Sequence, residues 1–152
     1  MLNINNNMQL SSGNFGNNAS MPTKFTCDGN DINPSLLISD VPEQAKSLVL
    51  IMDDPDAPAG IWDHWIVFNM APALTQIDEG AEPTGMHGLG TSGTLKYHGP
   101  CPPSGEHRYF FKLYALDTML DLGEGVSKGE VERAMEGHVI EQTELVGKYR
   151  RG

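Results

Sequence analysis

The residues best suited to chemistry in this sequence lie in the stretch HGPCPPSGEHRY, which runs from residue 98 to residue 109. Cys101 stands among prolines, and His107 follows it at the start of an apolar run. A thiol near an imidazole is the pairing of a nucleophile with its base. The same stretch also suits a rigid loop around a ligand, because its prolines leave few free backbone dihedrals.

A second candidate is the acidic loop DDPDAP at residues 53–58, which follows the apolar run SLVLIM. Its prolines keep the preceding residues out of the α region, so Asp54 and Asp56 stand on a stiff, extended loop. Stiffness favours a preorganised site, although solvated carboxylates in a proline-rich turn have the same sequence pattern. A few residues later, Trp62 and His64 open the next apolar run.

The spacing of these residues matches neither a nucleophilic catalytic site nor a metal site. Cys101 lacks the helix N-terminus that commonly activates a cysteine thiol. The acids and histidines, Asp54, Asp56, His64 and His107, match no HxxxH, HExxH or calcium-loop pattern. We therefore expect no catalytic residue, no metal site and no cofactor, and we keep a Cys/His hydrolase as the weakest alternative.

Short strands must hold these residues in place. The runs LLIS, SLVLIMD, HWIVFNM and RYFFKLYAL are rich in β-branched or aromatic residues and are bounded by Pro, Gly, Asn and Asp, which predicts strands. Alternation puts His107 and Tyr109 on one face of the last run and Arg108 on the other, where we expect an ion pair. In the HWIVFNM run, alternation separates His64 from Trp65.

One segment, SKGEVERAMEGHVIEQ at residues 127–142, has helical periodicity. Ser127 and Glu130 have capping-box spacing, and Val131, Met135 and His138 fall on one helical face with Ala134 and Val139. The following ELVGKYR alternates and predicts a closing strand. Short strands, one helix and proline-rich connections together predict a mainly β fold, a sandwich or barrel with a peripheral helix in the C-terminal half.

The chain has 152 residues, with 10 basic and 20 acidic side chains and a net charge of −10. This size favours one domain, which we place at residues 21–152, after an Asn-, Gly- and Ser-rich arm at residues 1–20 that we expect to be partly flexible. The negative charge argues against nucleic acid as a partner and against anionic bilayers.

The expected location is cytoplasmic, without integral membrane association. The N-terminus lacks the basic and apolar regions of a signal peptide, and no run approaches the roughly 18 apolar residues of a spanning helix. In a reducing compartment the two cysteines, Cys27 and Cys101, are expected to be thiols, although a bond between them stays open.

Four segments carry a wider resemblance: FTCDGNDINPSL, VPEQAKSLVLIMDDPDAPAG, HWIVFNM and YHGPCPPSGEHRYFFKLYALD. In this order and spacing they resemble the phosphatidylethanolamine-binding protein family, and most closely its small prokaryotic, Raf-kinase-inhibitor-like branch. The likeness extends from about Met8 to the C-terminus. It implies one domain of two antiparallel β-sheets in a Greek-key sandwich, with a small anion-binding cavity at one end and a cis peptide at Ala57–Pro58.

The resemblance also implies which residues line that cavity. The ligand-binding set would be Asp54, Pro58, Trp62, His64, Gly99, Cys101, His107 and Tyr109, while Asp56 and Pro55 would brace the loop. The branch usually has glycines where this chain has Lys96 and His98, so the rim of the cavity is expected to differ here.

The expected function is non-enzymatic binding of a small anion or of a phosphorylated or phospholipid head-group ligand, with a regulatory role as a kinase inhibitor. Two histidines can donate to an anion, whereas Asp54 would repel a dianion unless it orients a histidine or shares a proton. This predicts a monoanion that keeps an O–H. A protein inhibitor of a protease or kinase that acts through surface loops is the alternative, and monomer and homodimer both stay open.

Overall fold

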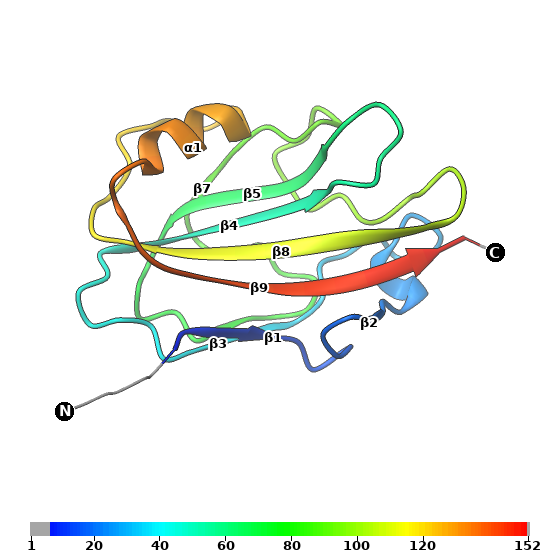
Figure 1. Cartoon of the computed structure of the whole chain (residues 1–152), viewed down its shortest axis with the longest axis horizontal. Helices are drawn as coiled ribbons and strands as arrows, with labels where there is room; N and C mark the ends of the chain where they lie inside the picture. The colour runs from blue at the N-terminus through cyan, green and yellow to red at the C-terminus, as the bar shows by residue number, and fades with distance from the viewer. Residues whose placement is uncertain (1–6, 152) are drawn as a thin grey trace.

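The computed structural model describes residues 7–151. Its elements are β1 (Gln9–Ser11), β2 (Ala19–Ser20), the 3-10 turn η1 (Thr23–Phe25), β3 (Leu36–Ser39), β4 (Ser47–Asp54), β5 (Trp62–Met70), β6 (Gln76–Ile77), β7 (Met86–His87), β8 (Glu106–Leu116), α1 (Lys128–Met135) and β9 (Val139–Arg150). Figure 1 shows these strands in two layers, with the short β1 and β3 below the long strands of the main sheet.

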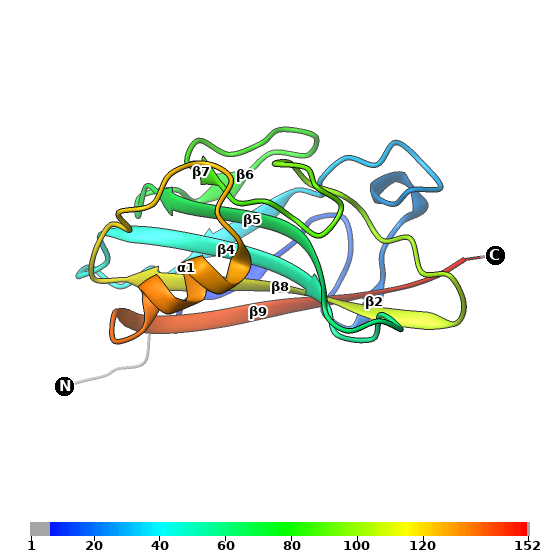
Figure 2. The same ribbon diagram turned by 90° about the horizontal axis from the view of Figure 1, so that it is seen from above.

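The main sheet has six strands in the order β2-β9-β8-β4-β5-β7, and the second sheet has three in the order β1-β3-β6. Neighbouring strands are antiparallel except for the short parallel pair of β2 and β9. Figure 2 shows α1 on one face of the main sheet, where its Val131 and Met135 share a core with Ile66 of β5. The predicted mainly β fold with two sheets and a peripheral helix is confirmed.

The central strand β4 is buried along its whole length because each of its faces meets a different apolar layer. Leu48, Leu50 and Met52 belong to the core between the two sheets. Val49 and Ile51 belong to a second core, where the sheet packs against α1 and the chain before it. A continuous apolar run is the pattern expected of a strand covered on both sides, and this position makes β4 a rigid support for the acidic loop that follows it.

Helix α1 begins as its sequence predicts and ends earlier. The side chain of Ser127 accepts from the backbone N–H of Glu130, and the Glu130 side chain accepts from the backbone of Ser127, so the capping box is confirmed. The helix stops at Met135, and Gly137 takes a φ of 80° that lets the chain reverse into β9. The predicted continuation to residue 142 is therefore wrong, and His138 is exposed beside Asp117.

The segment expected to form a flexible arm contributes to the domain over residues 7–20. Met8, Leu10 and Phe15 are buried in the core between the sheets, and β1 pairs with β3. Residues 1–6 of the predicted arm lie outside the described part of the chain. Within residues 7–151, no helix combines the length and apolar character needed to cross a membrane.

Candidate functional site

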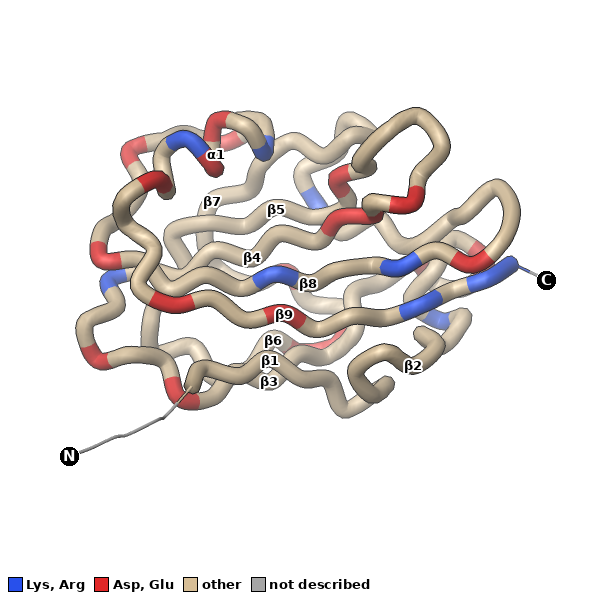
Figure 3. The backbone as a smooth tube through the Cα atoms, viewed as in Figure 1, with Lys and Arg blue, Asp and Glu red and all other residues tan. Residues whose placement is uncertain are grey.

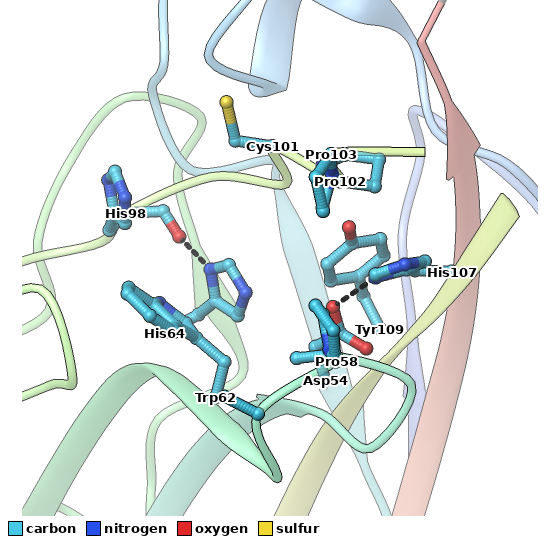
Figure 4. Close-up of a pocket in the computed structure, with 12 residues that line it drawn as sticks. Asp54, Pro58, Trp62, His64, His98, Cys101, Pro102, Pro103, His107 and Tyr109 are labelled. Atoms are coloured by element: carbon cyan, nitrogen blue, oxygen red, sulfur yellow. Dashed lines mark hydrogen bonds and ion pairs between the residues drawn. The ribbon is translucent and has the colours of Figure 1, made fainter. Parts of the chain in front are cut away.

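A cavity of about 210 Å³ lies where β4 ends and where β5 and β8 begin (Figure 4). This volume is below the roughly 300–1,000 Å³ of drug-sized ligand pockets, so it suits a ligand the size of a head group. The lining consists of Asp54, Ala57, Pro58, Ala59, Trp62, His64, His98, Cys101, Pro102, Pro103, His107 and Tyr109. Ala57, Ala59, Pro102 and Pro103 were missed by the sequence prediction, although they stand in or beside the two loops that it singled out. His98 was expected to alter the rim of the cavity, and it belongs to the lining.

Asp54, the last residue of β4, holds the ring of His107 from the start of β8. Its Oδ2 lies 2.7 Å from the Nδ1 of His107, and its Oδ1 accepts from the backbone N–H of Asp56 at 2.7 Å. Both side chains are buried. An ionised carboxylate can only accept hydrogen bonds, so the proton is on Nδ1 and the Nε2 of His107 remains for a ligand.

A β-bulge brings His64 to the cavity. The register of β4 against β5 pairs Met52 with Trp65 and Asp53 with Asp63, which leaves His64 as the extra residue. A bulge breaks the alternation of a strand and re-aims its side chains. His64 consequently meets the ring edge of Tyr109 at a centroid distance of 5.3 Å, and the predicted placement of His64 opposite to Trp65 is wrong.

The carbonyl of His98 fixes the other side of the His64 ring. The Nδ1 of His64 lies 2.6 Å from this oxygen, and a carbonyl can only accept, so Nδ1 carries the proton. Figure 4 shows the second ring nitrogen of His64 facing the cavity. Burial lowers the pKa of His64 and outweighs the hydrogen bond to His98. A neutral His64 therefore presents Nε2 to the cavity as an acceptor.

Tyr109 stands between the two histidines with an unused hydroxyl. The residue is fully buried, its ring lies 6.4 Å from that of His107, and its hydroxyl has no hydrogen-bond partner within residues 7–151. Burial, together with the nearby charge of Asp54, raises the pKa of Tyr109 far above its ordinary value. The hydroxyl thus stays protonated, and Figure 4 shows it pointing into the cavity.

The rim loop that carries Pro58 is held by an ion pair on the outer face of the sheet. Asp56 accepts from the backbone N–H of Arg108 and from its guanidinium, at 2.8–2.9 Å. Arg108 thus forms the predicted ion pair on the face opposite to His107, and Asp56 makes the contacts that bracing requires. All peptides of residues 7–151 are trans, so the implied cis bond at Ala57–Pro58 is wrong.

The loop at residues 97–103 is tied to the segment at residues 25–31. Gly99 donates its N–H to Asp31 at 2.7 Å, and a Cβ on Gly99 would lie 2.3 Å from the carbonyl oxygen of Phe25. Tyr97 donates its hydroxyl to the same oxygen at 2.7 Å. Gly99 therefore positions the loop, and it is not among the residues that line the cavity.

A disulfide joins Cys27 to Cys101, with Cα atoms 5.4 Å apart. The expectation of two thiols is therefore wrong for this structure, which leaves no free cysteine. Figure 4 shows the sulfur of Cys101 pointing away from the cavity. Cys101 contributes to the rim, and the Cys/His hydrolase alternative has no thiolate to act as its nucleophile.

Among the lining residues, only the histidines can carry a positive charge. The lining contains no Lys or Arg, so it includes none of the basic residues that Figure 3 shows along β8 and β9. Across residues 7–151, no group of three or more His, Cys, Asp or Glu side chains is arranged to hold a metal ion. The cavity therefore combines two oriented imidazoles, one hydroxyl donor and one carboxylate within a rim that is apolar except for His98.

Comparison with known proteins defines the class. The family model for phosphatidylethanolamine-binding protein matches residues 11–150, and the chain belongs to this family. The resemblance inferred from the four sequence segments is confirmed.

Two relatives and two solved structures show how near the match is. The UPF0098 protein of Methanothermobacter thermautotrophicus is 51% identical over 151 residues, covering 95% of this chain and all of the relative. The UPF0098 protein of Chlamydia pneumoniae is 49% identical over 147 residues, which cover 93% of this chain and 98% of the relative. The crystal structure of CT736, a phosphatidylethanolamine-binding protein homolog from Chlamydia trachomatis, gives a TM-score of 0.94 at 46% sequence identity. The match covers 97% of this chain and 100% of CT736. The crystal structure of YbcL from Escherichia coli, described as a new member of the mammalian family, gives a TM-score of 0.88 at 29% sequence identity. The match covers 95% of this chain and 99% of YbcL.

Proposed function

We propose that this protein binds a small phosphate-bearing ligand, as a monoanion that keeps one O–H, in the cavity between His64 and His107, and that it does so without chemical turnover. The observation that carries the proposal is the buried Tyr109 hydroxyl, which has no partner within residues 7–151. An unsatisfied buried hydroxyl costs roughly 1–3 kcal/mol. A ligand oxygen would remove that cost.

Each polar group of the cavity matches one atom type of such a ligand. The neutral His64 offers a lone pair on Nε2, which accepts from the P–OH of a monoanion. The Tyr109 hydroxyl donates to a second oxygen. An imidazolium at His107 would donate to a third, with the charge of Asp54 on its far side, and hydrogen bonds between charged groups are the stronger kind.

Binding, rather than catalysis, is proposed because Cys101 is held in the disulfide and the remaining groups suit recognition. A phospholipid head group and a phosphorylated small molecule share the chemistry required. A regulatory role as a kinase inhibitor would add a protein partner to this site. The alternative, an inhibitor of a protease or kinase acting through surface loops, would use residues such as Ile61, which is 57% exposed at the entry to β5.

The cytoplasmic location stays a prediction, and the disulfide between Cys27 and Cys101 is at odds with it. Disulfides are rare in cytosolic proteins of most organisms and persist in oxidising compartments. Counting thiols in protein isolated from its native host under thiol-trapping conditions would decide between these locations.

The proposed function is tested by titrating inorganic phosphate into the protein while the imidazole resonances of His64 and His107 are followed by NMR. Saturable shifts of both residues, without shifts of the exposed His138, support the proposal. A protein whose pocket variants lose phosphate binding but still inhibit a protease or kinase would favour the surface-loop alternative. The absence of any saturable shift would overturn the proposal.

A further inference from the structure

We infer that His98 is a specificity-determining residue of this cavity, selecting phosphate ligands that carry a second anionic group. The inference rests on the proposed function and adds the class of ligand. It starts from a residue that the resemblance marked as a departure from the family branch and that the structure places in the lining.

The ring of His98 lies next to that of His64, on the side of His64 away from His107 (Figure 4). Its side chain is 32% exposed, whereas His64 is buried. The two rings are stacked, with centroids 5.9 Å apart and planes inclined by 22°. A ligand that is bound to the inner groups and extends past His64 toward solvent would therefore reach His98.

Asp31 faces His98 from the loop before β3. Its Oδ2 lies 3.7 Å from the Nδ1 of His98, and its Oδ1 is fixed by the N–H of Gly99 at 2.7 Å. This carboxylate lies on the Nδ1 side of the ring, so Nε2 is the nitrogen available to a ligand. The other titratable groups close to His98 are His64 and, on its own loop, the exposed Lys96.

The rest of the rim offers little that could meet a charged group. It is formed by Ala57, Pro58, Ala59, Pro102 and Pro103. A second anionic group on the ligand would therefore pair with the imidazole of His98. The positive charge at His98 also disfavours protonation of His64, which keeps the inner histidine an acceptor for P–OH. The inner and outer histidines therefore act on different groups of one ligand.

The test compares orthophosphate with pyrophosphate, the simplest ligand with a second phosphate group, by NMR titration at constant ionic strength. Dissociation constants are measured for the wild type, His98→Gln and the neighbouring control Lys96→Gln. Glutamine keeps a polar side chain without the charge. Histidines change charge between pH 5 and 8, so the titrations are run at about pH 5.5 and about pH 8.

At the lower pH we expect the wild type to bind pyrophosphate about tenfold more tightly than orthophosphate, a difference of about 1.4 kcal/mol. His98→Gln should remove most of this preference while changing orthophosphate affinity about twofold or less, and Lys96→Gln should keep most of it. The wild-type preference should shrink at the higher pH.

A preference that survives in His98→Gln, or that falls equally in Lys96→Gln, overturns the inference while leaving the proposed function in place. Failure of the wild type to bind either phosphate would overturn both, and the histidine titration described above identifies that case.

Discussion

The Oδ2 atom of Asp54 lies 2.7 Å from the Nδ1 of His107, and this contact leaves Nε2 as the ring nitrogen available to a ligand. The other carboxylate oxygen is engaged by the backbone of Asp56. With both oxygens engaged inside the protein, Asp54 acts as a positioning residue for His107.

Replacing Asp54 by Asn should weaken phosphate binding roughly ten- to hundredfold, because hydrogen bonds to charged groups contribute about 1.5–3 kcal/mol. NMR titration with phosphate near neutral pH measures the change. Asp117→Asn is the matched control, since it alters a similar pair with His138 at 2.8 Å on the surface and should leave affinity unchanged. An increase in affinity for Asp54→Asn would show that the carboxylate repels the anion.

Burial of His64 makes the stability of the fold depend on pH. The pKa of His64 is lowered from 6.5, so at this residue the folded state binds fewer protons than the unfolded state. The contribution of His64 to the free energy of unfolding then falls as pH drops below about 6.5. His64→Gln should reduce the stability difference between about pH 7 and about pH 5, measured by urea unfolding in phosphate-free buffer. An unchanged difference would contradict a buried, neutral His64.

The ion pair between Asp56 and Arg108 should have a small effect on stability, confined to the higher pH range. Arg108 lowers the pKa of Asp56 from 3.8 to about 2, so the contribution is present above 3.8 and is lost as pH falls toward 2. Arg108 is exposed and Asp56 is partly exposed, and ion pairs near the surface contribute about 0–1 kcal/mol. Asp56→Asn should therefore lower the melting temperature slightly at neutral pH, and the difference should shrink at about pH 3. A deficit that stays constant at low pH would assign another role to Asp56.

The disulfide between Cys27 and Cys101 should stabilise the fold more than it shapes the cavity. It joins residues 74 positions apart, and cross-links of this span contribute up to about 4 kcal/mol in the chain-entropy account. The double variant Cys27→Ala with Cys101→Ala should melt at a lower temperature yet bind phosphate within a factor of about three of the wild type. The loop keeps its contacts through Gly99 and Tyr97. A large loss of affinity at a temperature where the variant remains folded would contradict this division of roles.

The parts of the site that were predictable from sequence depend on local rules. Alternation in RYFFKLYAL placed His107 and Tyr109 on the buried face, because a strand has a period of two residues. The capping box at Ser127 was equally local. The prolines around Asp54 indicated a stiff loop from backbone geometry alone.

The remaining parts depend on contacts between distant segments. The bulge at His64 follows from the register of β5 against β4, which no local pattern in HWIVFNM reveals. The disulfide depends on two segments meeting that are far apart in sequence. The position of Gly99 likewise depends on a distant residue, because its N–H donates to the side chain of Asp31. Alternation and composition carry no information about such pairings.

The most direct measurement of the central claim compares Tyr109→Phe with the wild type in two assays, thermal unfolding and phosphate titration by NMR. The hydroxyl of Tyr109 is buried without a partner within residues 7–151, so its removal should leave the melting temperature unchanged or raised in phosphate-free buffer. Phosphate affinity should fall about tenfold or more, as expected for loss of a hydrogen bond to a charged group. Unchanged affinity in a stably folded Tyr109→Phe protein would contradict the assignment of this cavity as the phosphate site.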